Sequence, residues 1–91
     1  MEYSELLQIY REQIDTLDKE IIYLFSRRFQ IVKQIWILKK ENNAVILQKD
    51  RWEKLLNENI EVWKDLMVPE QFIRDIWEKI HKESLKLEKE I

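Results

Sequence analysis

The sequence predicts an all-α protein, a three-helix chain whose long first helix pairs with a second copy of the same chain. The 91 residues include no Gly and one Pro, and 37% of them are charged, a composition typical of helical proteins. A seam with spacings alternating between three and four runs through the first part of the chain, which indicates a helix packed along its length. The seam consists of Leu7, Tyr10, Ile14, Leu17, Ile21, Leu24, Arg28, Ile31, Ile35 and Leu38.

The predicted first helix is too long to be covered by its own chain. Residues 5–41 contain no Gly or Pro and would form a rod of roughly 55 Å at 1.5 Å per residue. A compact monomer of this size is only about 25 Å across. We therefore expect a homodimer in which the two long helices cross and cover each other's seam.

Two breaks divide the rest of the chain. Glu41-Asn42-Asn43 brings two turn-forming residues together, and Ala44–Leu47 is expected to be a buried connector. A second helix is predicted from about Gln48 to Leu66. Pro69 followed by Glu70 favours the start of a third helix, because Pro suits the first turn and Glu complements the dipole.

Both of these helices have an apolar face. The residues predicted to point inward are Leu55, Leu56, Ile60 and Trp63 in the second helix, and Phe72, Ile73, Ile76, Trp77, Ile80, Ser84, Leu87 and Ile91 in the third. Residues 1–91 are predicted to form a single domain.

Charge and composition exclude several functional classes. The net charge is −2 and there is no cysteine, so we expect no nucleic-acid partner, no membrane partner and no disulfide framework. The first residues lack the basic and then apolar run of a signal peptide, which favours a cytoplasmic protein. No residue pattern calls for a metal or a cofactor.

Arg28 is the one charged residue on the seam. Lys39 follows it by almost three helical turns, on the same face and at roughly 16 Å, so two long side chains could hold a small dianion between them. Arg11 lies about 25 Å from Arg28 along the helix, but in an antiparallel dimer Arg11 of one chain can approach the region of residues 28–39 in the other. Snorkelling or a salt bridge is the alternative explanation for Arg28.

Further polar residues lie on the other two predicted helices. Gln48 and Arg51 are one turn apart at the start of the second, and Ser84 and Glu88 are one turn apart on the third. Three of them have a simpler explanation: Arg51 and Glu88 as surface charges, and Ser84 bonded to its own backbone. His81 is the only histidine and has no partner at metal-ligand spacing.

Three motifs together closely resemble the all-helical chorismate mutases. They are R-x-x-I-D-x-L-D at residues 11–18, R-R-F-x-x-V at 27–32, and E-S-x-x-x-E at 83–88. The resemblance covers nearly the whole chain. It implies an intertwined six-helix homodimer with two active sites, which rearranges chorismate to prephenate on the route to phenylalanine and tyrosine.

The reaction implied by this resemblance is an intramolecular [3,3] shift that needs no nucleophile, metal or cofactor. Positioning and preorganised charge can drive such a reaction. By resemblance, Arg28 and the partner's Arg11 bind the two carboxylates, and Lys39 donates to the ether oxygen and a carboxylate. Gln48 and Arg51 lie on the ring side of the substrate. Ser84 contacts a carboxylate, and Glu88 contacts the ether oxygen.

Four positions depart from the pattern of that family. Glutamine is common at position 88, whereas an ionised Glu88 can only accept a hydrogen bond, so activity should fall as the pH rises and this carboxyl loses its proton. Trp36 stands where glycine is usual, and it could close the pocket, repack the dimer or do no harm. Trp52 replaces a frequent glutamate, although a subgroup with an L-Q-x-x-R-W pattern shares it. Met67 lies in a link where glycine is frequent.

Two other functions remain open from the sequence. An isochorismate pyruvate-lyase uses a similar fold and a similar cationic site for a neighbouring elimination. An inactive helical dimer that docks to a partner synthase would be favoured if Trp36, Ile37 and Trp52 were exposed, because exposed apolar patches mark partner surfaces.

Overall fold

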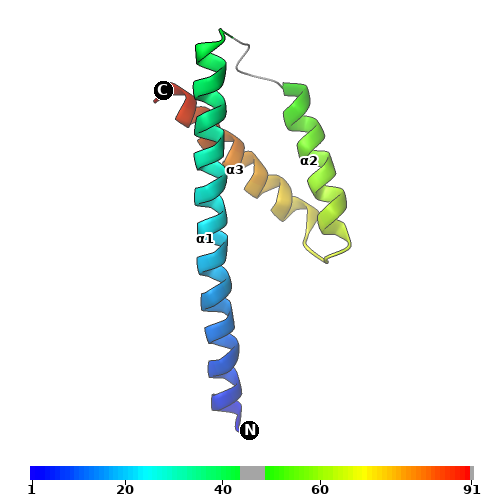
Figure 1. Cartoon of the computed structure of the whole chain (residues 1–91). Coiled ribbons are helices and arrows are strands. Elements are labelled where there is room, and N and C mark those ends of the chain that lie inside the picture. The colour runs from blue at the N-terminus through cyan, green and yellow to red at the C-terminus, as the bar shows by residue number, and fades with distance from the viewer. Residues whose placement is uncertain (44–48, 91) are drawn as a thin grey trace. The chain divides into compact units, whose positions relative to one another are not determined.

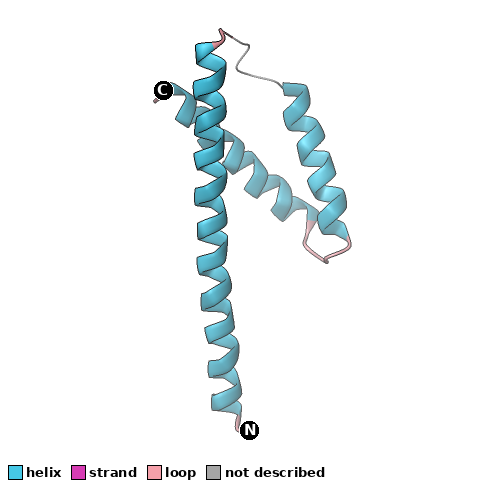
Figure 2. Ribbon diagram, viewed as in Figure 1, coloured by secondary structure: helices cyan, strands magenta, loops and turns pink. Residues whose placement is uncertain are grey.

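The computed structural model describes residues 1–43 and 49–90. These residues form three helices and no strand: α1 (Tyr3–Glu41), α2 (Lys49–Lys64) and α3 (Glu70–Lys89) (Figures 1 and 2). The predicted all-α class and the long first helix are thereby confirmed. Contacts divide the chain into two compact units, residues 1–31 and residues 32–91, which are described separately below.

The end of α1 is built by the two asparagines that follow it. The Leu38 carbonyl accepts from both donors of Asn42, the side-chain Nδ2 at 2.8 Å and the backbone N–H at 3.2 Å. Asn43 has a φ of 52°, a left-handed conformation that asparagine tolerates better than most residues. This confirms the predicted break. The expected connector Ala44–Leu47 and the residue Gln48 lie outside the described residues.

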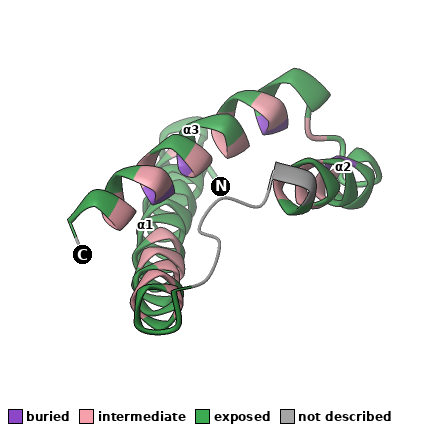
Figure 3. Cartoon of the chain, turned by 90° about the horizontal axis from the view of Figure 1, so that it is seen from above, coloured by how far each residue is buried: buried purple, intermediate pink, exposed green. Residues whose placement is uncertain are grey.

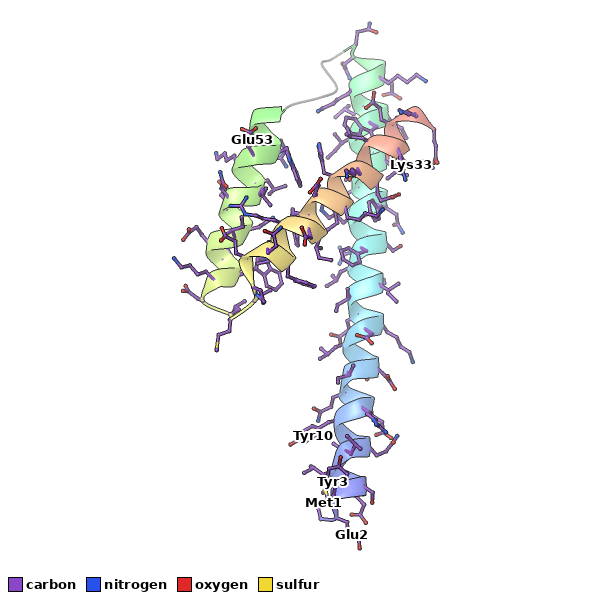
Figure 4. All side chains as sticks on the ribbon, turned by 180° about the vertical axis from the view of Figure 1, so that it is seen from behind. Met1, Glu2, Tyr3, Tyr10, Lys33 and Glu53 are labelled. Atoms are coloured by element: carbon purple, nitrogen blue, oxygen red, sulfur yellow. The ribbon has the colours of Figure 1, made fainter. Side chains whose placement is uncertain are left out.

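The first unit, residues 1–31, is the N-terminal part of α1, and its apolar seam is uncovered in the single chain. Tyr3 and Tyr10 project from this part of the helix (Figure 4) and are 80% and 53% exposed. Leu17 is 54% exposed, and α1 as a whole has no buried residue. A seam of this length left in water is what a helix that packs against another chain would present.

The second unit contains the core, which lies between α2 and α3. The two helices contact each other and are joined by a short link after Lys64. Ile60, Ile73 and Ile80 are buried, as is Ser84 (Figure 3). The apolar positions of α3 recur at three- and four-residue spacing, so they form one face that α2 can cover.

Trp63 of α2 and Trp77 of α3 extend this contact. Their rings lie with centroids 6.4 Å apart at an interplanar angle of 58°, an arrangement favoured by the charge distribution of aromatic rings. The inward orientation predicted for the second helix is confirmed, because Ile60 is buried and Leu55, Leu56 and Trp63 are half-buried.

The prediction that Phe72 points inward is wrong, since its side chain is 57% exposed. Its neighbour Ile73 is 2% exposed, so the covered face of α3 is centred on Ile73. A residue one position away is turned by about 100° around a helix, which places Phe72 at the edge of that face, in the first turn. Ile91, also predicted to be inward, lies outside the described residues.

Met67 lies in the link between α2 and α3 and has a φ of 61°. A left-handed conformation costs a residue with a Cβ about 1–2 kcal/mol, and the Met67 side chain is 92% exposed, so it gains little from packing. We predict that Met67→Gly raises the free energy of unfolding by about 0.5–1 kcal/mol, after allowing for the greater freedom of Gly in the unfolded chain.

Urea denaturation at a fixed protein concentration measures this effect, and Asn43→Gly is the matched control. Asn43 also has a positive φ, but asparagine already tolerates it, so its replacement should give a smaller gain. A Met67→Gly chain no more stable than the wild type would contradict the strain assigned to this link.

Candidate functional site

The two arginines of the first unit differ in their exposure. Arg11 is exposed, whereas Arg28 is half-buried and its Nη1 atom is shielded from solvent. The adjacent Arg27 is exposed and its guanidinium lies 5.9 Å from the centre of the Tyr23 ring. Arg28 therefore differs from its neighbour in the way expected of a charge that belongs to a site rather than to a solvated surface.

Lys39 lies near the end of α1, in the second unit, and is half-buried. Its Nζ atom is 5.3 Å from the centre of the Trp36 ring, within the range of a cation–π interaction. The two residues are three apart on the helix, a spacing that brings side chains together. The ammonium of Lys39 is thus held beside an aromatic face.

Ser84 is the only buried polar residue among those described, at 8% exposure. Its Oγ donates to the Ile80 carbonyl at 2.9 Å, which is the backbone bond anticipated for it from the sequence. Its own carbonyl accepts a 2.8 Å hydrogen bond from the Trp36 indole Nε1. This second bond joins the C-terminal segment of α1 to α3.

Arg51 is exposed in the first turn of α2, next to the half-buried Trp52. The Trp52 ring stacks on His81 of α3, with centroids 4.2 Å apart and an interplanar angle of 15°. The stack ties the start of α2 to α3 one turn before Ser84. Arg51 is therefore attached beside a fixed contact between the two helices.

Glu88 is half-buried and follows Ser84 by one turn on α3. The second unit thus carries four predicted site residues on helices that contact one another. Ser84 and Glu88 lie on α3 itself. Lys39 lies close to Trp36, which is bonded to α3, and Arg51 lies next to Trp52, which stacks on α3. Gln48 lies outside the described residues. Arg11 and Arg28 belong to the first unit.

Reasoning from the sequence missed two residues that organise this region. The sequence marks Trp36 as a departure from the family pattern and His81 as the only histidine, but it predicts no contact for either residue. The available signal was a large hydrogen-bonding ring at a position where the family resemblance leads us to expect glycine. Trp36, Ile37 and Trp52 are all half-buried, so the exposed patch that would favour a docking module is not found at these residues.

No group of three or more His, Cys, Asp or Glu residues within residues 1–43 and 49–90 could hold a metal ion. No helix in the same part of the chain combines the length and the apolarity needed to cross a membrane.

The chain is similar to several curated proteins. It is 30% identical, over all of its 91 residues, to the bifunctional chorismate mutase/prephenate dehydratase of Buchnera aphidicola subsp. Acyrthosiphon pisum (strain APS), of which it covers 24%. It is 33% identical, over 96% of its length, to the bifunctional chorismate mutase/prephenate dehydratase of Aquifex aeolicus (strain VF5), of which it covers 25%. The T-protein of Haemophilus influenzae (strain ATCC 51907 / DSM 11121 / KW20 / Rd) is 35% identical over 56% of the chain, which covers 14% of that protein.

The chain spans about a quarter of the length of its two bifunctional relatives. No solved structure gives a significant match. The family model described as chorismate mutase type II matches residues 10–89, a range that includes every candidate site residue from Arg11 to Glu88. The chain therefore belongs to the chorismate mutase type II family.

Proposed function

We propose that this chain is a chorismate mutase, which rearranges chorismate to prephenate in the biosynthesis of phenylalanine and tyrosine in the cytoplasm. One observation carries the proposal: the family match spans residues 10–89, and all seven candidate positions within it hold charged or hydrogen-bonding side chains. In the reaction the ether C–O bond breaks and a C–C bond forms within one molecule, so no group is transferred to the protein. The work left to the protein is to hold the reactive shape and to stabilise the separating charge.

Each polar residue then has a task that suits its chemistry. Arg28 and the Arg11 supplied by a second copy bind the two carboxylates, because a guanidinium pairs with a carboxylate through two parallel hydrogen bonds. Lys39 donates to the ether oxygen and a carboxylate. Gln48 and Arg51 line the ring side, and Glu88 donates to the ether oxygen when it is protonated. Ser84 contacts a carboxylate by turning its single hydroxyl proton away from the Ile80 carbonyl, to which it donates in the free chain.

The proposed active form is a homodimer of six helices in which both units of each chain complete one domain. The exposed seam of α1 supports this form, since Ile14, Leu17 and Ile21 are each about half exposed in the single chain and a second copy would cover them. A shared site follows from the same arrangement, because each copy lends Arg11 to the other.

The side chain at position 88 decides whether a hydrogen-bond donor faces the ether oxygen in the proposed site. A protonated carboxyl can donate to the ether oxygen, whereas an ionised one only accepts. We predict that Glu88→Gln, whose amide always carries donor N–H groups, turns over chorismate faster than the wild type at neutral pH.

Glu78→Gln is the matched control for this experiment. Glu78 is an exposed residue of the same helix, paired with Lys82 at 3.4 Å, and its replacement should leave the turnover rate at the wild-type value. A Glu88→Gln chain that is no faster than the wild type would contradict the role given to Glu88.

The proposed function is tested by mixing the purified chain with chorismate, following the loss of the diene absorbance and identifying the product. Saturable formation of prephenate is the expected result. Release of pyruvate from isochorismate without turnover of chorismate would assign the lyase reaction instead. A folded dimer that turns over neither compound would contradict both enzymatic functions and favour the docking module.

A further inference from the structure

The Trp36 side chain contacts one proposed site residue on its own helix, α1, and another on α3. Its indole Nε1 donates to the Ser84 carbonyl of α3 at 2.8 Å, and its ring lies 5.3 Å from the Nζ of Lys39 on α1. One side chain thus contacts a residue on each helix. The indole is half-buried, so water competes less for these contacts than it would at an exposed position.

The bond to Ser84 acts on the backbone of α3 rather than on a side chain. A carbonyl oxygen has two lone pairs, so the Ser84 carbonyl can accept from the indole as well as from the helical partner that the α-helical pattern assigns to it, the N–H of Glu88. The Ser84 Oγ is itself bonded to Ile80. Trp36 therefore anchors the turn of α3 that contains Ser84 and Glu88.

The ring acts on Lys39 in a different way. Lysine has a long and flexible side chain, and fixing it costs conformational entropy. An aromatic face within cation–π range favours those rotamers that keep the ammonium beside it. Lys39 is thereby partly ordered before any ligand arrives.

We propose that Trp36 is a positioning residue of the active site, which holds the ammonium of Lys39 and the Ser84–Glu88 turn of α3 in fixed positions relative to each other. The proposal rests on the proposed chorismate mutase function. Trp36 does not touch the reacting atoms in this account. It acts through a hydrogen bond to one helix and through a ring contact on the other, which a glycine at this position cannot supply.

Two substitutions separate these contacts. Trp36→Phe keeps an aromatic face for Lys39 but removes the indole donor, whereas Trp36→Leu removes both. Because Ser84 is proposed to bind a carboxylate, Trp36→Phe should chiefly raise KM, by about three- to ten-fold. Because Lys39 is proposed to act on the ether oxygen, Trp36→Leu should raise KM as much and also lower kcat, by about three-fold or more.

A merely structural role for Trp36 predicts a different division of the effect between KM and kcat. Partial unfolding would reduce the active fraction in both variants, which lowers the apparent kcat and leaves KM unchanged. Trp63→Phe is the control, since Trp63 packs against Trp77 in the hairpin of α2 and α3. It should leave both KM and kcat at wild-type values.

Nuclear magnetic resonance tests the anchor without any turnover. We expect the Trp36 indole proton to be protected from solvent exchange in the wild type. We also expect the ε-methylene protons of Lys39 to show a ring-current shift that Trp36→Phe retains and Trp36→Leu abolishes. Wild-type turnover without these two signals would overturn the anchor and leave the function standing. Both signals in a chain that does not convert chorismate would overturn the function, and with it the catalytic role of Trp36.

Discussion

Arg28→Ala is expected to lower kcat/KM for chorismate by a factor of about 10² to 10³, the usual cost of losing one preorganised charged donor. Arg28 is the single charged residue on the seam of α1, and its Nη1 atom is shielded from solvent. In the proposed site its guanidinium grips a carboxylate through two hydrogen bonds. Arg28→Lys keeps the charge but loses that geometry, so it should recover only part of the activity.

Arg27→Ala is the matched control, since it removes the same side chain one position away. Arg27 is exposed and contacts the Tyr23 ring, so its loss should change kcat/KM by no more than a few-fold. Steady-state kinetics on the three variants, with circular dichroism to verify folding, measure the difference. Equal losses from Arg27→Ala and Arg28→Ala would contradict the selective role of Arg28.

Leu17→Lys is expected to convert the dimer to monomers and to abolish turnover at the same time. Leu17 lies on the seam and is 54% exposed in the single chain, so the proposed dimer buries it against the other copy. An ammonium at such a position is desolvated without a partner and costs several kcal/mol. Analytical ultracentrifugation over a range of concentrations, alongside the chorismate assay, measures both effects.

Ser26→Lys adds the same charge to the same helix at an exposed position that is not part of the seam. It should leave the sedimentation coefficient and the rate close to those of the wild type. A Leu17→Lys chain that remains dimeric, or that is monomeric and fully active, would contradict the shared site.

The helices could be predicted from the sequence because their signals are local. The asparagines after Glu41 and the Pro69–Glu70 pair mark boundaries that the structure places within a residue or two of the expected positions. The error at Phe72 has a physical origin. Spacing alone assigns a residue to the apolar face of a helix. The centre of the buried part of that face depends on where the neighbouring helix lies, which the sequence of one helix does not specify.

The candidate site could be predicted only in part. The residues able to bind a dicarboxylate were found from Arg28 on the seam, from residue types and from the family resemblance. The contacts that hold them were not found, because the bond from Trp36 joins residues 48 apart in sequence and the Trp52–His81 stack joins two helices. Such pairings arise from tertiary packing. A large residue at a position where glycine is expected indicates a new contact but does not identify the other residue in it.

Complementation between two inactive variants tests whether the site is shared. Arg11→Ala and Arg28→Ala are unfolded and refolded together in equal amounts. In a mixed dimer one site takes Arg28 from one chain and Arg11 from the other, and both are intact there. Random pairing makes half of the dimers mixed with one intact site each, so we expect chorismate conversion at about a quarter of the wild-type rate. Activity no greater than that of the two variants refolded separately would contradict a site built across two copies of this chain.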